Sequence, residues 1–487
     1  MDQNEIFKYI FPITVYMDGW VKDWLLDQRK NGEKGLEIKK LGNSFYVYRS
    51  TTYWDKQLKK VRKRSKYLGK LDEHDGFIEG QKRDTVATVK TVWQYGNAVL
   101  LSRVFDTLIP SLKKGFEGYW QDVYALALVR TQGYVPLKRA RTSWEKLYDV
   151  HGVSPNLEPK NLSSVLKKVG MNRRGQNMVF DHLSINGDEL VYDLSSFFTQ
   201  SDEIPIAEKG YNKDRVQLKQ INLALICSVD SGLPTMIRVL PGSIRDIVSL
   251  YASIEEIGVK GKILILDRGF FSEDVIDFLS GKKVFYILPT RRNSKLYDVR
   301  IHLNKHLFYH DRLIKCGKRK HNDYFLYLFE DTQLRLEEEK NLYKMFDEKK
   351  IDGGTLKENM IVSGDILIVS NMDVDASEIF MLYKKRDGVE NLFDVYKTTL
   401  NADRTYLRDD ASIFGHVFVS FLSLYGYCTI HQLIKKAGLD SKFSPIDLLE
   451  EYSKVYRVDC GDKVLLSEVP KKVYNLDKKL ETNIFPN

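Results

Sequence analysis

Cysteine is scarce in this chain, with four residues among 487. They are too far apart for the CxxC spacing of a zinc site and too few for a disulfide framework, at Cys227, Cys316, Cys428 and Cys460. We therefore expect reduced core thiols, no structural zinc and a cytoplasmic protein. The N-terminus also lacks a basic segment before its short apolar run, which indicates that it is not a signal peptide.

Charge is missing from one long stretch, because residues 411–430 contain no Asp, Glu, Lys or Arg. A helix of that length could span a bilayer. The stretch nevertheless contains His416 and several Ser and Gly residues, and it directly follows a charged segment. We therefore predict a buried core helix and no membrane span, with His416 as a hydrogen-bonded core histidine rather than a ligand.

The chain does contain enough apolar and aromatic residues for folded cores, since 43% of its residues are hydrophobic and 12% are aromatic. This composition excludes a disordered protein. A length of 487 residues exceeds what one core usually organises, so we expect roughly two to four domains or large insertions.

Positive charge is concentrated near the N-terminus. Residues 36–70 hold eleven Lys and Arg against two acids, a net charge of +9 that equals the formal charge of the whole chain. The run 44–54 is rich in aromatic and β-branched residues, which is typical of a strand. The run 61–71 follows after a short polar link and is its expected partner. We predict a basic β-hairpin region over residues 1–80.

Residues 81–184 have helical patterns over 116–133, 136–150 and 161–183, and the last two carry several Lys and Arg. Small helical modules with basic faces commonly enter DNA grooves. A helix rich in Lys and Arg is also an ordinary exposed helix. We favour a helical DNA-binding region.

From about residue 186 the pattern changes to strands and then to alternating strands and helices, which predicts a mixed α/β sheet. Residues 291–362 interrupt this alternation. The interruption is too long for a loop in a compact domain, so we predict an insertion, mostly β with one helix. The run GDILIVSN at 364–371 would resume the sheet.

Two acidic residues lie where apolar, strand-like runs stop: Asp193 closes DELVYD and Asp267 closes KILILD. The carboxyl end of a buried strand presents a rigid carboxylate where ligands bind in open α/β sheets. The alternatives are that Asp193 caps a turn at Ser195 and Ser196, and that Asp267 pairs with Arg268.

A third acid lies in the run YKKRDGVENLFDVYK at 383–397. On one helix, offsets of three, seven and fourteen from Tyr383 fall within about 60° of each other, so that Arg386, Glu390 and Lys397 would share its face. Such a face is also common as a solvated surface with weak ion pairs, such as Arg386 with Glu390. Gly388 weakens a continuous helix by roughly 1 kcal/mol relative to Ala.

The order Asp…Asp…Glu, with the last acid inside Tyr-x2-Arg-x3-Glu-x6-Lys and with RGFFS after the second, resembles the DDE transposases of bacterial and archaeal insertion sequences. The resemblance covers about residues 185–430 and implies an RNase H-like catalytic domain there, with the insertion at about 291–362. It implies a C-terminal region, 431–487, with possible dimer contacts.

The resemblance gives the three acids a common role as metal ligands and catalytic residues. Carboxylates without a His or Cys pair favour Mg²⁺, with Mn²⁺ as substitute, and two ions can serve in-line displacement at phosphorus. Asp193 would bridge both ions. The expected DNA contacts are Tyr383, Arg386, Lys397, Arg291, Arg292, Lys295, Arg62, Arg64 and Lys66.

The resemblance also implies the partners: transposon-end DNA, target DNA and a second copy of the chain in a synaptic homodimer. We expect the protein in the cytoplasm, associated with the nucleoid when it binds DNA. Two alternatives remain open, an inactive or domesticated descendant that binds DNA without cutting it, and a nuclease of the same fold that acts on another nucleic acid.

Overall fold

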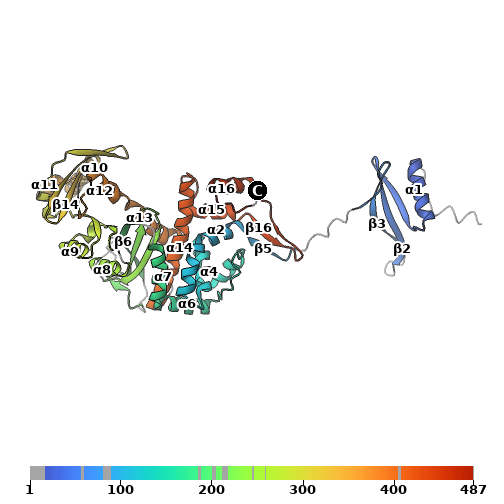
Figure 1. Cartoon of the computed structure of the whole chain (residues 1–487), viewed down its shortest axis with the longest axis horizontal. Coiled ribbons are helices and arrows are strands. Elements are labelled where there is room, and N and C mark those ends of the chain that lie inside the picture. The colour runs from blue at the N-terminus through green and yellow to red at the C-terminus, as the bar shows by residue number, and fades with distance from the viewer. Residues whose placement is uncertain are drawn as a thin grey trace, which may run out of the picture. The chain divides into compact units, whose positions relative to one another are not determined.

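The computed structural model divides the chain into two compact units, Met1–Val89 and Lys90–Asn487 (Figure 1). Each unit has its own hydrophobic core. The residues that the structure describes are 17–55, 60–80, 89–184, 188–199, 204–210, 218–243, 246–257, 259–403 and 407–485.

The first unit is a helix packed on a four-stranded antiparallel sheet, in the order β1-β2-β3-β4. Its elements are α1 (Gly19–Lys30), β1 (Leu36–Leu41), β2 (Ser44–Asp55), β3 (Lys60–Asp72) and β4 (Gly76–Glu79). The predicted hairpin is confirmed as β2 and β3. Its core is formed by Val21, Leu25, Ile38, Phe45, Val47 and Leu71. The outer halves of β2 and β3 extend beyond this core and are mostly exposed.

The second unit is built on a ten-stranded mixed sheet, which confirms the predicted α/β class. Its central strands are β6 (Glu189–Thr199), β8 (Lys219–Ser228), β9 (Pro234–Pro241), β10 (Ile263–Ile265) and β11 (Phe285–Pro289), and the short β7 (Glu208–Lys209) also pairs with β8. Strands β9, β8 and β6 pair antiparallel, whereas β10 and β11 run parallel to β6. These five strands lie in the order β9-β8-β6-β10-β11.

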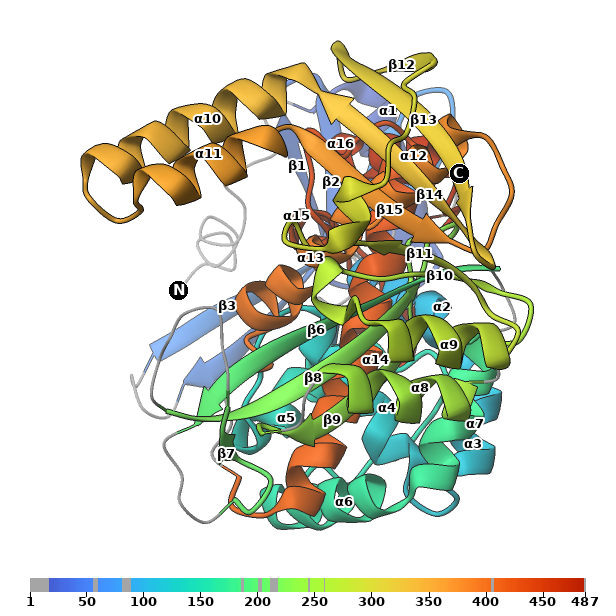
Figure 2. The ribbon, with the colours of Figure 1, turned by 90° about the vertical axis from the view of Figure 1, so that its left-hand side faces the viewer.

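Helices cover both faces of this sheet (Figure 2). On one face lie α8 (Asp246–Ile257) and α9 (Glu273–Gly281), and the buried Tyr192 hydroxyl of β6 hydrogen-bonds Ser249 of α8 at 2.6 Å. On the other face lies α14 (Asp410–Lys436), with the helices that precede the sheet packed around it. These are α2 (Gly96–Phe105), α3 (Ile109–Gly115), α4 (Trp120–Thr131), α5 (Leu137–Glu145), α6 (Pro159–Met171) and α7 (Arg173–Ser184).

The charge-free stretch 411–430 forms part of α14, as predicted, and this helix belongs to the core. By length and composition α14 could cross a membrane, but 89% of its most apolar window is buried inside the fold. It crosses α6 very closely, because a Cβ on Gly415 would lie 1.9 Å from the carbonyl oxygen of Leu166. A Cβ on Gly170 of α6 would lie 1.8 Å from the carbonyl oxygen of Ala411. Glycine is therefore required on both sides of the crossing.

The insertion after β11 continues the main sheet. Its strands are β12 (Lys305–Tyr309), β13 (Arg312–His321) and β14 (Tyr324–Asp331), and β15 (Asp365–Ser370) pairs with both β14 and β11. Two helices, α10 (Thr332–Asp347) and α11 (Gly353–Ile361), lie side by side where one was predicted (Figure 2). The helix α11 begins with two glycines, which disfavour a helix in the sequence pattern. The Asp352 side chain nevertheless caps α11 by accepting from the Thr355 amide at 2.8 Å.

The C-terminal region packs within the second unit. It contains α15 (Pro445–Tyr452), β16 (Tyr456–Asp459), β17 (Val464–Leu466) and α16 (Lys471–Leu480). Strand β16 pairs with β17 and with β5 (Thr91–Gln94), so the region is joined to residues at the start of this unit. All four cysteines are free, and three of them are buried.

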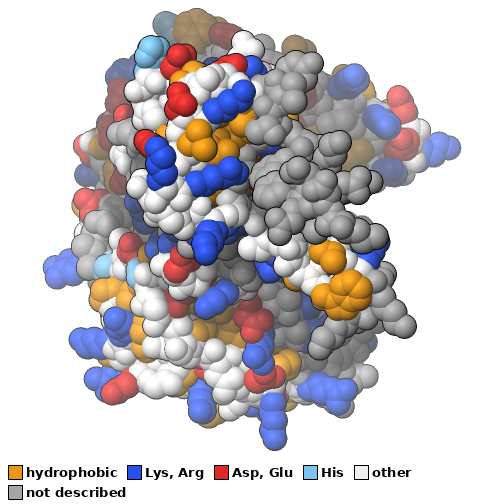
Figure 3. Space-filling view, turned by 90° about the vertical axis from the view of Figure 1, so that its right-hand side faces the viewer, with side chains coloured by type: hydrophobic (Ala, Val, Ile, Leu, Met, Phe, Trp, Pro, Cys, Tyr) orange, Lys and Arg blue, Asp and Glu red, His pale blue; other side chains and the backbone are white. Residues whose placement is uncertain are grey.

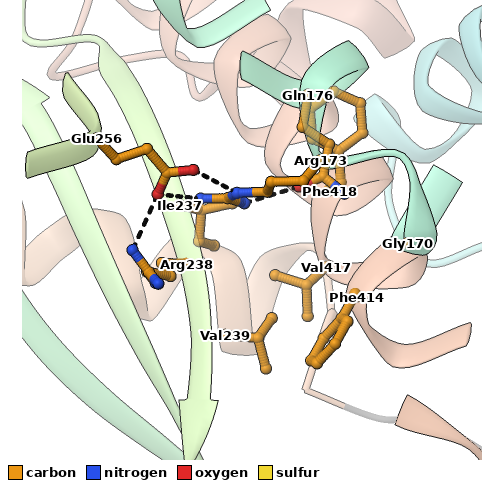
Figure 4. A pocket seen from close by; sticks show the side chains of 10 residues that line it. All are labelled: Gly170, Arg173, Gln176, Ile237, Arg238, Val239, Glu256, Phe414, Val417 and Phe418. Atoms are coloured by element: carbon orange, nitrogen blue, oxygen red, sulfur yellow. Dashed lines mark hydrogen bonds and ion pairs between the residues drawn. The ribbon is translucent and has the colours of Figure 1, made fainter. Parts of the chain in front are cut away.

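An ion-pair network joins α7 to the sheet beside a cavity of about 300 Å³ (Figure 4). The Arg173 guanidinium donates to both carboxylate oxygens of Glu256, at 2.5 and 2.6 Å. Arg238 of β9 donates to the same carboxylate at 3.0 Å. The charged groups of this cavity thus satisfy one another, and they fix the helices that precede the sheet against its β9 edge.

Candidate active site

The strand register brings two of the three predicted acids together. Residues Ile263 to Ile265 of β10 pair in parallel with Glu189 to Val191 of β6. Continuing this register by two residues sets Asp267 opposite Asp193. Neighbouring strands lie about 4.8 Å apart and opposite side chains share a face, so we expect the two carboxylates to be adjacent. Both side chains are half-buried.

Asp193 does not end its strand, contrary to the prediction. β6 continues to Thr199, pairing with β8 on one side only, because β10 stops at Ile265. The polar Ser195 and Ser196 suggested a turn, but they lie in this continuation, and Ser196 Oγ bonds Asn222 Oδ1 at 2.7 Å. Asp193 thus lies where its parallel neighbour ends, which opens one edge of the strand to the surface.

The segment with Tyr-x2-Arg-x3-Glu-x6-Lys, which we call the signature segment, is not one continuous helix, so the prediction of a single helix is wrong. It consists of α12 (Ala376–Lys384), α13 (Asp387–Asp394) and a π-helical turn, Val395–Thr399. The break at residues 385–386 adjoins Gly388, which supports a helix poorly. The wider π turn changes the angular position of Lys397 relative to a regular helix.

Two lysines hold α13 against β6. Lys385 Nζ lies 2.8 Å from Glu189 Oε2, and Lys397 Nζ donates to the Ser196 carbonyl oxygen at 2.7 Å. Glu189 and Ser196 lie on either side of Asp193 in β6, and the lysines lie on either side of Glu390. The strand is about 23 Å long from Glu189 to Ser196, and the helical segment is about 18 Å long from Lys385 to Lys397. The two lengths are similar, so both lysines can reach β6 while α13 lies between them against the strand.

Residues 190–425 match the family model described as Transposase DDE domain. This match supports a DDE transposase, and it contains all three predicted acids. No curated protein matches the chain.

One solved structure similar to this chain is the piggyBac transposase synaptic complex with hairpin DNA, determined by cryo-EM. The two chains share 12% sequence identity over 81% of this chain and 86% of the other, with a TM-score of 0.38. A TM-score of this size does not establish a shared fold.

Arg386 lies beside one of the three predicted acids, Asp267. Its guanidinium lies 3.8 Å from the Asp267 carboxylate, and the two side chains are 12% and 26% exposed. It also lies over the Tyr383 ring, 5.9 Å from the centroid. Burial raises the pKa of Tyr383, so its hydroxyl keeps its proton near neutral pH. Asp267 and these two signature residues therefore form one cluster.

The adjacent aspartates fit a hard divalent cation, since carboxylate oxygens are the ligands that Mg²⁺ and Mn²⁺ prefer. Among the described side chains, which do not include that of Glu390, no three His, Cys, Asp or Glu groups lie close enough to hold a metal ion. The backbone of Glu390 belongs to α13, and its side chain lies outside the part of the structure that is described. Its role as third ligand stays a prediction.

The three cations of the predicted basic loop 291–295 lie in different environments. Arg291 Nη2 donates to the Gly269 carbonyl at 3.0 Å, two residues after Asp267, which places Arg291 beside the acidic site. Arg292 instead pairs with Glu338 of α10 at 2.7 Å. Lys295 is exposed at the start of a short 3₁₀ helix. Arg292 thus ties the insertion to the loop, whereas the other two remain candidates for DNA contact.

The three predicted DNA contacts of the hairpin are exposed on β3 in the first unit. Arg62 lies 3.4 Å from Asp55 across the strand pair. Among the described residues, neither Arg64 nor Lys66 takes part in an ion pair.

His416 is a buried core histidine, as predicted. Its Nε2 donates to the Ala402 carbonyl at 2.8 Å, just after the π turn, and its Nδ1 accepts from Arg130 Nη1 at 3.3 Å. Burial and the Arg130 charge lower the pKa of His416 to about 3. Sequence reasoning missed Arg130, although it is the one basic residue in the apolar run YALALVRT. Burial lowers the pKa of Arg130 to about 10.

Proposed function

We propose that this chain is a DNA transposase of the bacterial and archaeal insertion-sequence group with the Tyr-x2-Arg-x3-Glu-x6-Lys signature. It binds the terminal inverted repeats of its element and catalyses metal-dependent strand cleavage and strand transfer in cut-and-paste transposition. One observation carries the proposal: the bonds from Lys385 and Lys397 hold the helix of Glu390 across the strand of Asp193.

In this proposal Asp193, Asp267 and Glu390 hold two Mg²⁺ ions, or Mn²⁺ in their place. Bound there, such ions activate the attacking oxygen and stabilise the leaving oxygen of an in-line displacement. Arg386 balances the Asp267 charge before DNA arrives. Its guanidinium can then bind a phosphate, since it pairs with either anion through the same fork of donors. Tyr383, which keeps its proton, can donate to a phosphate oxygen.

The reaction also sets the proposed partners. Two transposon ends must be paired before they join target DNA, which requires at least a homodimer in the synaptic complex. The protein would act in the cytoplasm, at the nucleoid.

The decisive experiment compares two acid-to-amide variants of the same helix. Purified protein is incubated with Mg²⁺ and a duplex from the DNA that flanks its gene, and nicking at the ends is scored. We expect Glu390→Gln to abolish cleavage and to leave end binding nearly unchanged. Asp394→Asn, one helical turn later and exposed, should cleave like the wild type.

Each result has a distinct meaning. Retained cleavage by Glu390→Gln would remove Glu390 from the site. End binding by the wild type without cleavage would favour the domesticated descendant, and cleavage without preference for the ends would favour the nuclease.

A further inference from the structure

The outer part of the β2–β3 hairpin is a two-stranded ribbon with two different faces. Opposite residues of an antiparallel pair lie on the same face, and successive residues alternate between faces. Thr51 pairs with Arg64 and Tyr53 with Arg62, whereas Ser50 pairs with Ser65. The register from Arg49–Lys66 to Asp55–Lys60 therefore defines a first face, and the register from Tyr48–Tyr67 to Trp54–Val61 defines a second.

The first face is cationic. It carries five cations, at Arg49, Lys60, Arg62, Arg64 and Lys66. Two acids lie beside them, Asp55 near Arg62 and Glu33 near Arg49, so the face has a net charge of +3. We call it the cationic face.

The second face carries less charge. Its cation Lys63 pairs with Glu37 at 2.6 Å, which lowers the pKa of Glu37, and Lys39 of β1 lies 4.8 Å from the centre of the Tyr48 ring, so this face has a net charge of +1. Ser50 also donates to Glu37, at 2.6 Å, and lies 2.8 Å from the Ser65 hydroxyl. Arg64 and Lys63 are thus neighbours in sequence, but Lys63 pairs with an acid whereas Arg64 lies on the face with the other cations.

Positive charge alone does not mark a DNA site on this protein, because Lys and Arg are spread over the visible surface in Figure 3 with Asp and Glu among them. The ribbon differs because its charge is sorted by face. Its outer part is seven residues long in β2, about 20 Å, and a two-stranded ribbon is one of the elements that the major groove admits. The cationic face also offers Arg and Thr side chains, which can read guanine and the thymine methyl group.

We infer that the cationic face of the β2–β3 ribbon enters the major groove of double-stranded DNA, with Arg64 at its centre and the less charged second face turned away. The inference rests on the proposed function for the choice of DNA as the partner. It adds which face of the hairpin binds, and in which groove.

The test uses single-charge variants on the two faces of the full-length chain. Binding of a fluorescent end duplex is measured by anisotropy, without divalent ions so that no cleavage intervenes. Arg64→Ala should weaken binding on the order of tenfold to a hundredfold, and Lys63→Ala less than about threefold. Both residues are exposed, and matching melting curves would confirm that the variants are folded.

The groove is tested with guanine methylated at N7, an atom that lies in the major groove. Such a duplex should bind the wild type more weakly, and Arg64→Ala should respond less to the modification. Equal losses for the two variants, no effect of methylation, or no binding of the wild type to duplex DNA would each overturn the inference. Failure of cleavage with these binding results intact would count against the transposase proposal alone.

Discussion

The crossing of α6 and α14 allows a stability prediction of defined sign. In Gly415→Ala the new Cβ would lie 1.9 Å from the Leu166 carbonyl oxygen, whereas real Cβ atoms essentially never come within 3.0 Å of such an atom. The helices must therefore separate by at least about 1 Å, and overpacking of this kind costs about 1–3 kcal/mol or more. The better helix propensity of Ala returns at most about 1 kcal/mol. We expect a net loss on the order of 2 kcal/mol.

The chain supplies a matched control with the opposite sign. A Cβ on Gly388 of α13 would meet nothing within 4 Å, so Gly388→Ala should gain up to about 1 kcal/mol. Urea unfolding followed by far-ultraviolet circular dichroism would measure both variants against the wild type. A Gly415→Ala variant as stable as the wild type would refute the close crossing of α6 and α14.

Two further predictions concern groups near the signature. Lys397→Met removes the charged donor to the Ser196 carbonyl oxygen. Hydrogen bonds to charged groups contribute about 1.5–3 kcal/mol, so we expect cleavage to slow by about tenfold or more while end affinity changes less. An unchanged cleavage rate would contradict this role. The pKa of His416 is about 3 in the fold and near 6.5 when unfolded, so its contribution to stability is complete above pH 6.5 and is lost as the pH falls toward 3. His416→Gln should flatten the slope of unfolding free energy against pH between 4 and 6 by up to about 1.4 kcal/mol per unit, and an unchanged slope would mean that His416 does not titrate in this way.

The sequence was sufficient for features that depend on local chemistry. The mixed sheet, the hairpin and the buried course of α14 follow from residue type and periodicity, and all three are confirmed. The adjacency of Asp193 and Asp267 could be anticipated only as two acids beside strands, because the register between β6 and β10 depends on how the whole sheet pairs.

Features set by tertiary contacts could not be read from the sequence. The π turn at residues 395–399 has no compositional signal, and it exists where Lys397 reaches the Ser196 carbonyl. Ser195 and Ser196 look like turn residues, yet pairing with β8 keeps them extended. No pattern in the sequence connects Arg130 with His416, and only the fold shows that the two side chains are in contact.

The position of α14 in the sequence has a consequence for synthesis of the chain. Its apolar surface completes the core of α4 and α6, which are made well over two hundred residues earlier. While the ribosome produces the strands and the insertion, those earlier helices contact one another but lack α14, which covers part of their apolar surface. Such surfaces aggregate when they stay exposed, so the nascent chain should depend on chaperones until residue 436 has emerged.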